Sequence, residues 1–313
     1  MSGRELVVLG TASQAPTRRR NHNGYLLRWD GFGVLFDPGE GTQRQMVSAG
    51  VASADVDLIC ITHLHGDHCL GLPGVLARMS LDRHSGEVEI LYPEPSHRDM
   101  VILLHAGVGR RTVTPVAVPC SEGVVRDGPP LTITARSLDH GVPTLGWRLE
   151  EPAGITMDHR ALEEAGIRGA AVGELIGTGS VTAGGRTFRL EEMSRPRPGH
   201  SFALVMDTRP CPAAVDLARG ADLLLCESTF LAGEERMADE YRHMTAGQAA
   251  ALAREAGVGR LVLTHYSQRH PDEADFAREA AAIFPDVVAA RDLDRIPFPS
   301  RRRPGADSLF AEP

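Results

Sequence analysis

The sequence predicts a mixed α/β fold in which helices cover layers of β-sheet. Short apolar runs with the length of buried strands, such as residues 6–9, 56–61 and 261–263, alternate with amphipathic stretches of helical length. Several of these runs end on histidine or aspartate, so polar side chains are expected at the carboxyl ends of strands. No repeat of the solenoid type is present. These observations predict layered sheets and helices with a polar site where strands end.

Length and composition bound the class of protein. A chain of 313 residues can bury a large core, as one big domain or as two fused halves. With 33 basic and 41 acidic residues the net charge is −8, so a polyanionic partner would have to be met by a local patch. The five cysteines are odd in number and form no CxxC pair, which indicates a reducing, cytoplasmic setting. No signal-peptide pattern and no run of about 18 apolar residues is found, so we expect a soluble protein without a membrane partner.

The first part of the chain carries a basic loop and a strand-end aspartate. The expected elements are strands at 6–9, 24–29 and 33–36, and a helix through 46–47. Between the first two strands stand Arg18, Arg19 and Arg20, which fit either a solvated turn or a phosphate contact near an active centre. Asp37 follows the third strand. It could accept the second ring N–H of a metal-binding histidine, or it could cap a helix.

A dense cluster of potential metal ligands follows the next predicted strand. His63, His65, Asp67 and His68 fall within six residues. In an extended segment His63 and His65 point the same way and can reach one ion, whereas Gly66 lets the chain turn and direct the other pair at a neighbouring position. Nitrogen and carboxylate ligands suit zinc or a similar first-row cation. The pattern therefore favours two metals over a surface loop that is merely rich in histidine.

The middle of the chain adds another strand-end histidine and a change of texture. The expected elements are helices at 70–79 and 98–105 and strands at 88–92, 113–118 and 131–137. The last of these strands runs into His140. From about residue 150 to 199 the apolar runs break up and glycine and proline accumulate, with one short helix expected at 159–165. We interpret this segment as a mobile excursion inserted into the core.

The last third returns to strands that end on polar residues. A strand at 202–206 ends on Asp207 and mirrors the strand before Asp37, which suggests two related halves. Glu227 follows a strand at 223–226, and His265 follows one at 261–264. The remaining expected elements are a helix at 246–256 with a capping box and a glycine stop, a helix at 271–283, a strand at 286–290, and an arginine-rich tail at 301–303 that we expect to fray.

Seven residues share the strand-end position: His63, His65, Asp67, His68, His140, Asp207 and His265. A binuclear site requires about this number, roughly three or four protein ligands per metal, with Asp207 as the natural bridge. Two metals about 3.5–4 Å apart would activate a water as nucleophile and stabilise the charge that develops on a phosphoryl group.

The motifs resemble a known family. The pattern His-x-His-x-Asp-His at 63–68 resembles the signature of the metallo-β-lactamase superfamily. The order of six strings looks like the tRNA 3′-endonucleases of the ribonuclease Z family, and the resemblance runs from about Leu6 to Pro299. These strings are GEGTQ at 39–43, HLHGDHCLGLPG at 63–74, MDT at 206–208, CESTF at 226–230, HMT at 243–245 and LTHYS at 263–267.

The resemblance implies a four-layer αββα sandwich spanning residues 1–313, with a flexible tRNA-binding arm inserted at about 150–199. It implies a homodimer that hydrolyses precursor tRNA on the 3′ side of the discriminator nucleotide and leaves a tRNA 3′-hydroxyl and a trailer 5′-phosphate. It also implies two Zn²⁺ per subunit. By match of motif, His63, His65 and His140 would hold the first zinc, Asp67, His68 and His265 the second, and Asp207 both.

The same match gives roles to residues beside the metals. Asp67 is assigned as proton acceptor, and Glu227 and His243 correspond to positions near the scissile phosphate. An imidazole held by a carboxylate could protonate the leaving ribose oxygen, although His243 also fits a structural role beside the helix cap at 245. The sequence departs from the family at Cys226, where many relatives have histidine.

The arm departs from the family more strongly. Gly169-Ala170 replaces the usual Gly-Pro, and the segment contains no lysine. The cations available to the arm are arginines: Arg160, Arg168, Arg186 and Arg189 within it, and Arg195 and Arg197 at its base. A weak arm would lower the affinity for tRNA.

Three other functions compete with the tRNA endonuclease. A paralogue on the same scaffold could hydrolyse small phosphodiesters or sulfate esters, and a weakened arm would favour it. A catalytically idle RNA-binding protein would be expected to lack ligands, and none of the seven is missing. A thiol-ester hydrolase of the glyoxalase type would share the metal loop but would not need the GEGTQ string or Glu227 and His243.

Overall fold

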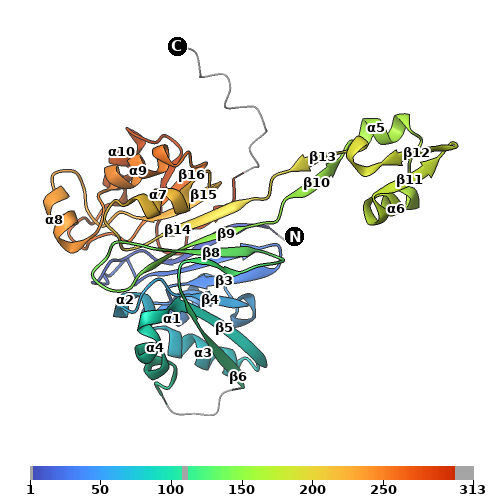
Figure 1. Ribbon diagram of the computed structural model, residues 1–313. Helices are drawn as coiled ribbons and strands as arrows, with labels where there is room; N and C mark the ends of the chain where they lie inside the picture. Colours follow the sequence, from blue (N-terminus) through green and yellow to red (C-terminus); the bar gives the residue numbers. More distant parts are fainter. Residues whose placement is uncertain (1–2, 108–111, 300–313) are drawn as a thin grey trace.

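The computed structural model describes residues 3–107 and 112–299, so the expected tail at 301–303 lies outside the described residues. Two seven-stranded sheets pack face to face, and helices cover both outer faces (Figure 1). The αββα sandwich is therefore confirmed. Among the described residues, no helix is long and apolar enough to cross a membrane.

The first sheet has the order β18-β1-β2-β3-β4-β5-β6. Its strands and the helices of its outer face are β1 (Glu5–Gly10), β2 (Gly24–Trp29), β3 (Phe32–Phe36), α1 (Thr42–Ser48), β4 (Leu58–Cys60), α2 (Gly66–Cys69), α3 (Leu72–Leu81), β5 (Gly86–Pro93), α4 (His97–Leu104), β6 (Val113–Cys120) and β18 (Arg295–Pro297). Short 3₁₀ turns occur at Ser53–Asp55 and Glu94–Ser96.

The second sheet has the order β17-β16-β15-β14-β9-β8-β7. Its elements are β7 (Gly123–Arg126), β8 (Thr132–Ser137), β9 (Leu145–Glu150), β14 (Ser201–Val205), α7 (Pro212–Ala218), β15 (Leu223–Glu227), α8 (Glu235–Tyr241), α9 (Ala246–Glu255), β16 (Arg260–Thr264), α10 (Glu273–Ala281) and β17 (Val287–Ala289). Helices α7, α9 and α10 lie over its outer face (Figure 1).

Three apolar layers hold the sandwich together. One fills the space between the sheets and includes the buried rings of Trp147, Phe36 and Phe202. The others lie between each sheet and its helices, with Leu76 of α3 in one and Leu252 of α9 in the other. Because the central strands are covered on both faces, they are almost continuously apolar, as parallel strands in α/β proteins usually are.

The strand directions bring the polar strand ends together. β3, β4, β5 and β6 run parallel in the first sheet, and β14, β15, β16 and β17 run parallel in the second. The carboxyl ends of parallel strands meet at one edge of a sheet, which is where ligands bind in open α/β folds. Most of the predicted metal ligands follow these strands, and His140 follows β8, which runs in the same direction as β14, so both sheets contribute to one site.

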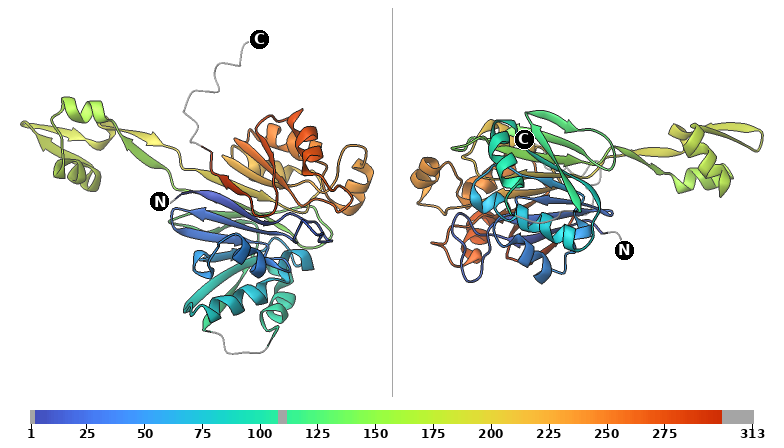
Figure 2. Two further views of the ribbon diagram at one scale, coloured as in Figure 1. Left: turned by 180° about the vertical axis from the view of Figure 1, so that it is seen from behind. Right: turned by 90° about the horizontal axis from the view of Figure 1, so that it is seen from below.

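An arm projects from the second sheet between β9 and β14 (Figures 1 and 2). Its stalk is the antiparallel pair β10 (Gly154–Met157) and β13 (Ser194–Arg197). Its tip contains α5 (His159–Glu164), α6 (Ala170–Thr178), the hairpin β11 (Ser180–Ala183) and β12 (Arg186–Arg189), and a 3₁₀ turn at Leu190–Glu192. The tip has its own apolar cluster, which includes Leu175, Val181 and Phe188.

The sequence pattern underestimates the regular structure in several places. The helix expected at 70–79 is α3, shifted by two residues, and the short helix α2, which carries Asp67 and His68, precedes it and is not expected from the pattern. Helices α7 and α8 are not expected from the pattern. In the arm, α6 forms although Gly173 and Gly177 lower its helix propensity, because Leu175 is fully buried in the tip cluster. Tertiary burial outweighs local propensity there.

Candidate metal centre and active site

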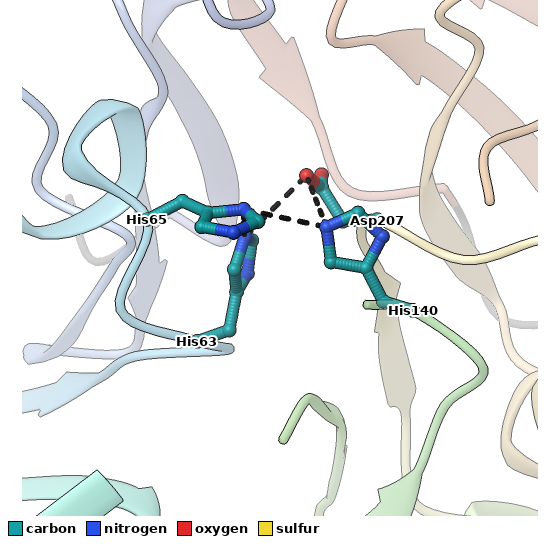
Figure 3. A group of neighbouring side chains, drawn as sticks. All are labelled: His63, His65, His140 and Asp207. Atoms are coloured by element: carbon teal, nitrogen blue, oxygen red, sulfur yellow. Dashed lines mark hydrogen bonds and ion pairs between the residues drawn. The ribbon is translucent and has the colours of Figure 1, made fainter. Parts of the chain in front are cut away.

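The predicted ligands converge where the two sheets end. Donor atoms of His63, His65, His140 and Asp207 all lie within 4.8 Å of one another, and Figure 3 shows the three imidazoles and the carboxylate directed at a common point. A second group with the same spacing contains Asp67, His68 and His265. Histidines from the first sheet and residues from the second thus face each other across the sandwich edge.

Asp207 lies between the two groups. Its Oδ2 is 3.5 Å from His63 Nε2 and 3.4 Å from His68 Nε2, and its Oδ1 is 3.2 Å from His265 Nε2. A carboxylate reached by histidines from both groups can bridge two cations. Asp207 has a φ of 44° and His265 a φ of 61°, in the left-handed region that non-glycine residues rarely adopt. Such strain costs on the order of 1–3 kcal/mol and clusters at functional sites.

Two carboxylate–threonine pairs orient two of the histidines. The Thr62 hydroxyl donates to Asp37 Oδ2 at 2.7 Å, so it accepts from His63 Nδ1, 3.0 Å away. In the second sheet the Thr229 hydroxyl donates to Glu227 Oε2 at 2.7 Å and accepts from His265 Nδ1, 2.8 Å away. Each arrangement fixes the tautomer and leaves Nε2 directed at the centre.

Two further contacts orient the remaining buried histidines. His68 Nδ1 lies 2.9 Å from Asp37 Oδ2, and Asp37 does not cap α1, whose N-cap is Gly41. His140 Nδ1 donates to the carbonyl of Arg242 at 3.2 Å, and the Arg242 guanidinium donates back to the carbonyl of His140 at 2.6 Å. The loop that carries His140 is thereby tied to the loop that carries His243.

The donor set fits a bound cation. Asp207 Oδ1 and His265 Nε2 are buried and have no hydrogen-bond partner, a costly arrangement unless another group occupies the centre. Burial lowers the pKa of His63, His65 and His140, which favours the neutral imidazole that binds metals. The centre contains nitrogen and carboxylate donors only, so it can bind a metal such as a first-row divalent ion.

Glu227 and His243 form a buried pair beside this centre. Glu227, the last residue of β15, is completely buried and accepts from His243 Nδ1 at 2.9 Å and from the Thr208 amide at 2.7 Å. Burial lowers the pKa of His243, but the carboxylates of Glu227 and Asp207 outweigh burial and raise it to about 9. The imidazole lies near the tilted rings of His140 and His265, with ring centroids 5.1 and 5.2 Å away.

A pocket of about 380 Å³ opens over the predicted metal ligands and His243. Phe230, Tyr241 and Arg269 also line it, and none of them was predicted as a site residue. Phe230 is the last residue of the CESTF string, whereas Tyr241 and Arg269 are signalled only by standing within four residues of His243 or His265. The pocket therefore offers aromatic surface and a cation beside the metal centre, a combination that suits an unstacked nucleotide.

The five arginines predicted to contact RNA fall into three environments. Arg18 and Arg19 are exposed and line a neighbouring pocket, which shares Gln268 with the pocket over the metal ligands. Arg20 is buried and paired with Glu273. Arg195 and Arg197 lie on the stalk of the arm, on β13, away from the metal centre (Figure 1). Only Arg18 and Arg19 combine exposure with a position beside the site.

Comparisons with known proteins agree with this geometry. Residues 4–114 match the model of the anti-Pycsar protein Apyc1, and residues 187–266 match that of the beta-lactamase superfamily domain. The ribonuclease Z of Nocardia farcinica is 52% identical over 305 residues, covering 96% of this chain and 100% of the relative. The chain belongs to the ribonuclease Z family.

Other ribonuclease Z proteins match over similar lengths. That of Streptomyces coelicolor is 52% identical and that of Chlamydia pneumoniae 45% identical, each over 96% of this chain. Among solved structures, the short form of human tRNase Z superposes with a TM-score of 0.70 at 24% identity, over 95% of this chain and 100% of that one. The resemblance to ribonuclease Z and the αββα fold that it implies are both confirmed.

Proposed function

We propose that the protein is a metal-dependent endoribonuclease that removes the 3′ trailer from precursor tRNA. Cleavage falls on the 3′ side of the discriminator nucleotide and leaves a 3′-hydroxyl on the tRNA and a 5′-phosphate on the trailer. The observation that carries this proposal is a seven-residue metal centre with a Glu227–His243 pair at its rim, in a chain 52% identical to a ribonuclease Z along almost its whole length.

We assign two zinc ions to the two groups of ligands. His63, His65 and His140 would hold one ion, Asp67, His68 and His265 the other, with Asp207 shared between them. Bound zinc lowers the pKa of water and polarises phosphoryl oxygens. The assignment is supported by the imidazole and carboxylate donors, which zinc binds, and by the orientation of the buried histidines, whose Nε2 atoms face the centre.

The protein side chains supply two proton transfers. Asp67 Oδ2 lies 3.7 Å from His265 Nε2 at the floor of the pocket, where it would take the proton of the attacking water. The water oxygen bonds to phosphorus as the bond from phosphorus to the ribose O3′ breaks. His243, kept protonated by Glu227, would donate its Nε2 proton to O3′, and Glu227 would stabilise the imidazolium until the proton leaves.

Family membership and the cysteines support a proposal for the assembly and the compartment. We propose that the enzyme is a homodimer that works in the cytoplasm. All five cysteines are free, which suits a reducing compartment. Sedimentation equilibrium at micromolar concentrations would show a single species of twice the monomer mass, and a monomer at all concentrations would contradict the dimer.

A small-molecule phosphodiesterase on the same scaffold is the second candidate, and the charge of the arm favours it. Six arginines and seven carboxylates lie between residues 151 and 199, so the arm is not a basic RNA-binding surface. This activity would use the same metal centre and the same Asp67, but would not depend on the arm.

One experiment separates the two candidates. Metal-loaded protein and its Asp67→Ala variant are incubated with a 3′-extended precursor tRNA and, separately, with bis(p-nitrophenyl) phosphate. A single cut after the discriminator base that is lost in the variant supports the endonuclease. Turnover of the aryl ester alone, with intact tRNA, would sink the tRNA assignment and retain the metal centre.

A further inference from the structure

The arm and the metal centre lie at separate places on the molecule, and a substrate that touches both binds at two points. Figures 1 and 2 show the tip, with α5 and α6, carried away from the sandwich on the β10–β13 stalk. Two-point binding raises affinity only when the geometry allows both contacts at once. The direction of the stalk therefore determines how much the arm contributes.

The net charge of the arm adds little affinity for RNA, so it cannot compensate for an arm that points in the wrong direction. Five of its six arginines pair with carboxylates of the same segment: Arg160 with Glu164, Arg168 with Glu163, Arg189 with Glu191, Arg195 with Asp158 and Arg197 with Glu151. Exposed pairs of this kind are weak and can exchange a carboxylate for a phosphate. The nearly neutral total, however, gives little long-range attraction for RNA. Affinity must then depend mainly on shape and direction.

The two strands that enter and leave the arm are pinched together at its base. The Glu151 amide donates to the His200 carbonyl at 2.9 Å, and the His200 amide donates to Glu151 Oε2 at 3.1 Å. Gly199 is needed at this point, because a Cβ there would lie 1.8 Å from the Glu151 carbonyl oxygen. The stalk therefore begins at a tight crossing rather than at a loose pair of linkers.

One side chain from the other sheet binds both residues at this base of the arm. Arg4, which directly precedes β1, donates to both carboxylate oxygens of Glu151, at 2.9 and 3.0 Å, and to His200 Nδ1 at 2.9 Å. The same guanidinium donates to Asp30, in the turn between β2 and β3, and stacks over the Trp29 ring at 4.4 Å. We call Arg4, Asp30, Glu151 and His200 the arm-base clasp.

The clasp joins the two sheets at the root of the arm. Arg4 and Asp30 belong to the first sheet, whereas Glu151 and His200 flank the arm in the second. The Arg4 side chain is only 13% exposed and Glu151 14%, so their attraction is screened less than that of a surface pair. A planar guanidinium that makes a two-pronged contact and a ring contact fixes direction as well as distance.

We propose that Arg4 is a positioning residue that holds the arm in the direction required for a substrate to reach the metal centre while it contacts the arm. This inference rests on the proposed tRNA function. Arg4 touches neither metal ligands nor the pocket over them, so its effect is confined to substrates large enough to reach the arm. A short phosphodiester gives the same chemistry without the arm.

The kinetic test compares Arg4→Ala with wild type on precursor tRNA and on bis(p-nitrophenyl) phosphate. We expect KM for precursor tRNA to rise by about 10-fold, because part of the affinity gained by binding the arm and the metal centre together is lost. We expect kcat to change by less than about twofold and turnover of the aryl ester to stay unchanged. Arg28→Ala is the matched control, because Arg28 also bridges two carboxylates on the first sheet, Glu5 and Asp55, but does not contact the arm. Arg4→Lys should recover only part of the loss, since an ammonium cannot form the two-pronged contact.

A structural readout tests the clasp without any substrate. Spin labels at Thr187→Cys on the arm tip and Ser48→Cys on α1, with Cys211→Ser as background, report the distance between tip and sandwich. We expect a narrow distribution in the protein with Arg4, a broad one after Arg4→Ala, and a narrow one after Arg28→Ala. An unchanged distribution in the Arg4→Ala protein would overturn the proposal.

The kinetic outcomes are equally decisive. Equal losses on both substrates would show that Arg4 acts through general stability and would overturn the positioning role, as would an unchanged KM for precursor tRNA. If wild-type protein fails to cut precursor tRNA, the proposed function fails, and the spin-label distances still decide whether Arg4 directs the arm.

Discussion

Arg20 was predicted to contact RNA, but the structure gives it partners within the protein, so its role can be tested by mutation. Its Nε donates to Glu273 Oε1 at 2.6 Å, and its Nη1 donates to the His270 carbonyl at 2.8 Å. The guanidinium also lies over the Tyr266 ring, 4.9 Å from its centroid. Arg20 therefore joins the basic loop near the N-terminus to the segment that follows the predicted metal ligand His265. We expect Arg20→Ala to act on stability first.

The magnitude follows from burial. The Arg20 side chain is 4% exposed and Glu273 11%, so removing the arginine leaves an almost fully buried carboxylate whose remaining ion pair is with the largely exposed Arg291, 3.6 Å away. Breaking a buried pair costs about 3–5 kcal/mol in the free energy of unfolding, and because Arg291 remains we expect the low end, about 3 kcal/mol. For a domain of this size, that corresponds to a loss on the order of 10 °C in Tm. Circular dichroism melts and urea titrations at pH 7 would measure both quantities.

Arg18→Ala is the matched control from the same loop. Arg18 is exposed, so its removal should change the free energy of unfolding by less than about 0.5 kcal/mol. It lies beside the pocket over the metal centre, so its removal should weaken binding of precursor tRNA and make that binding less dependent on salt. The reasoning is refuted if Arg20→Ala melts within about 2 °C of wild type and weakens tRNA binding as Arg18→Ala does.

Three further predictions concern the site and a neighbouring carboxyl. Asp207→Asn should abolish turnover of both tRNA and aryl ester and reduce bound metal by elemental analysis, because the shared ligand is lost; full metal content with full activity would contradict this. His243→Ala should lower kcat on precursor tRNA by about 10²–10⁴-fold, the usual contribution of a general acid, with metal content unchanged; a purely structural His243 would instead lower Tm and leave kcat near wild type. Burial raises the pKa of Asp292 to about 6. Its protonated form therefore contributes about 3 kcal/mol to the free energy of unfolding below about pH 4, and this contribution is lost as the pH rises through 6. Asp292→Asn, whose amide can donate to the Thr11 hydroxyl, should remove this loss. Denaturant titrations at pH 4 and pH 7 give the free energy of unfolding at each pH, and the prediction is refuted if this free energy changes equally between the two pH values in the variant and in wild type.

Local patterns were sufficient for most strands of the two large sheets and for the predicted ligands that follow them, whereas β7, β9, β18 and the strands of the arm were not expected. An apolar run followed by histidine or aspartate indicates a buried strand and the residue at which that strand ends. Both features depend only on residues that are neighbours in the sequence. His63, His65 and Asp67 lie within five consecutive residues, so their proximity is set by the chain itself. The capping box of Thr245 and Gln248 is likewise local, and the structure has both of its hydrogen bonds.

Longer sequence motifs predicted the family. The motifs from GEGTQ to LTHYS predicted ribonuclease Z, and relatives about half identical over the whole chain confirm it. The αββα architecture came with that resemblance, because alternating strands and helices alone indicate mixed layers without their order.

Only the tertiary structure decided which arginines face solvent and which hold the protein together. Arg18 and Arg20 stand in one run of three, yet one is exposed and the other is paired with Glu273, a partner 253 residues away. Arg4 meets Glu151 across 147 residues and the two sheets. The sequence determined where strands end and which donors stand there, because these depend on short-range periodicity. The partners of a long cation depend on how distant segments pack, and no local pattern records that choice.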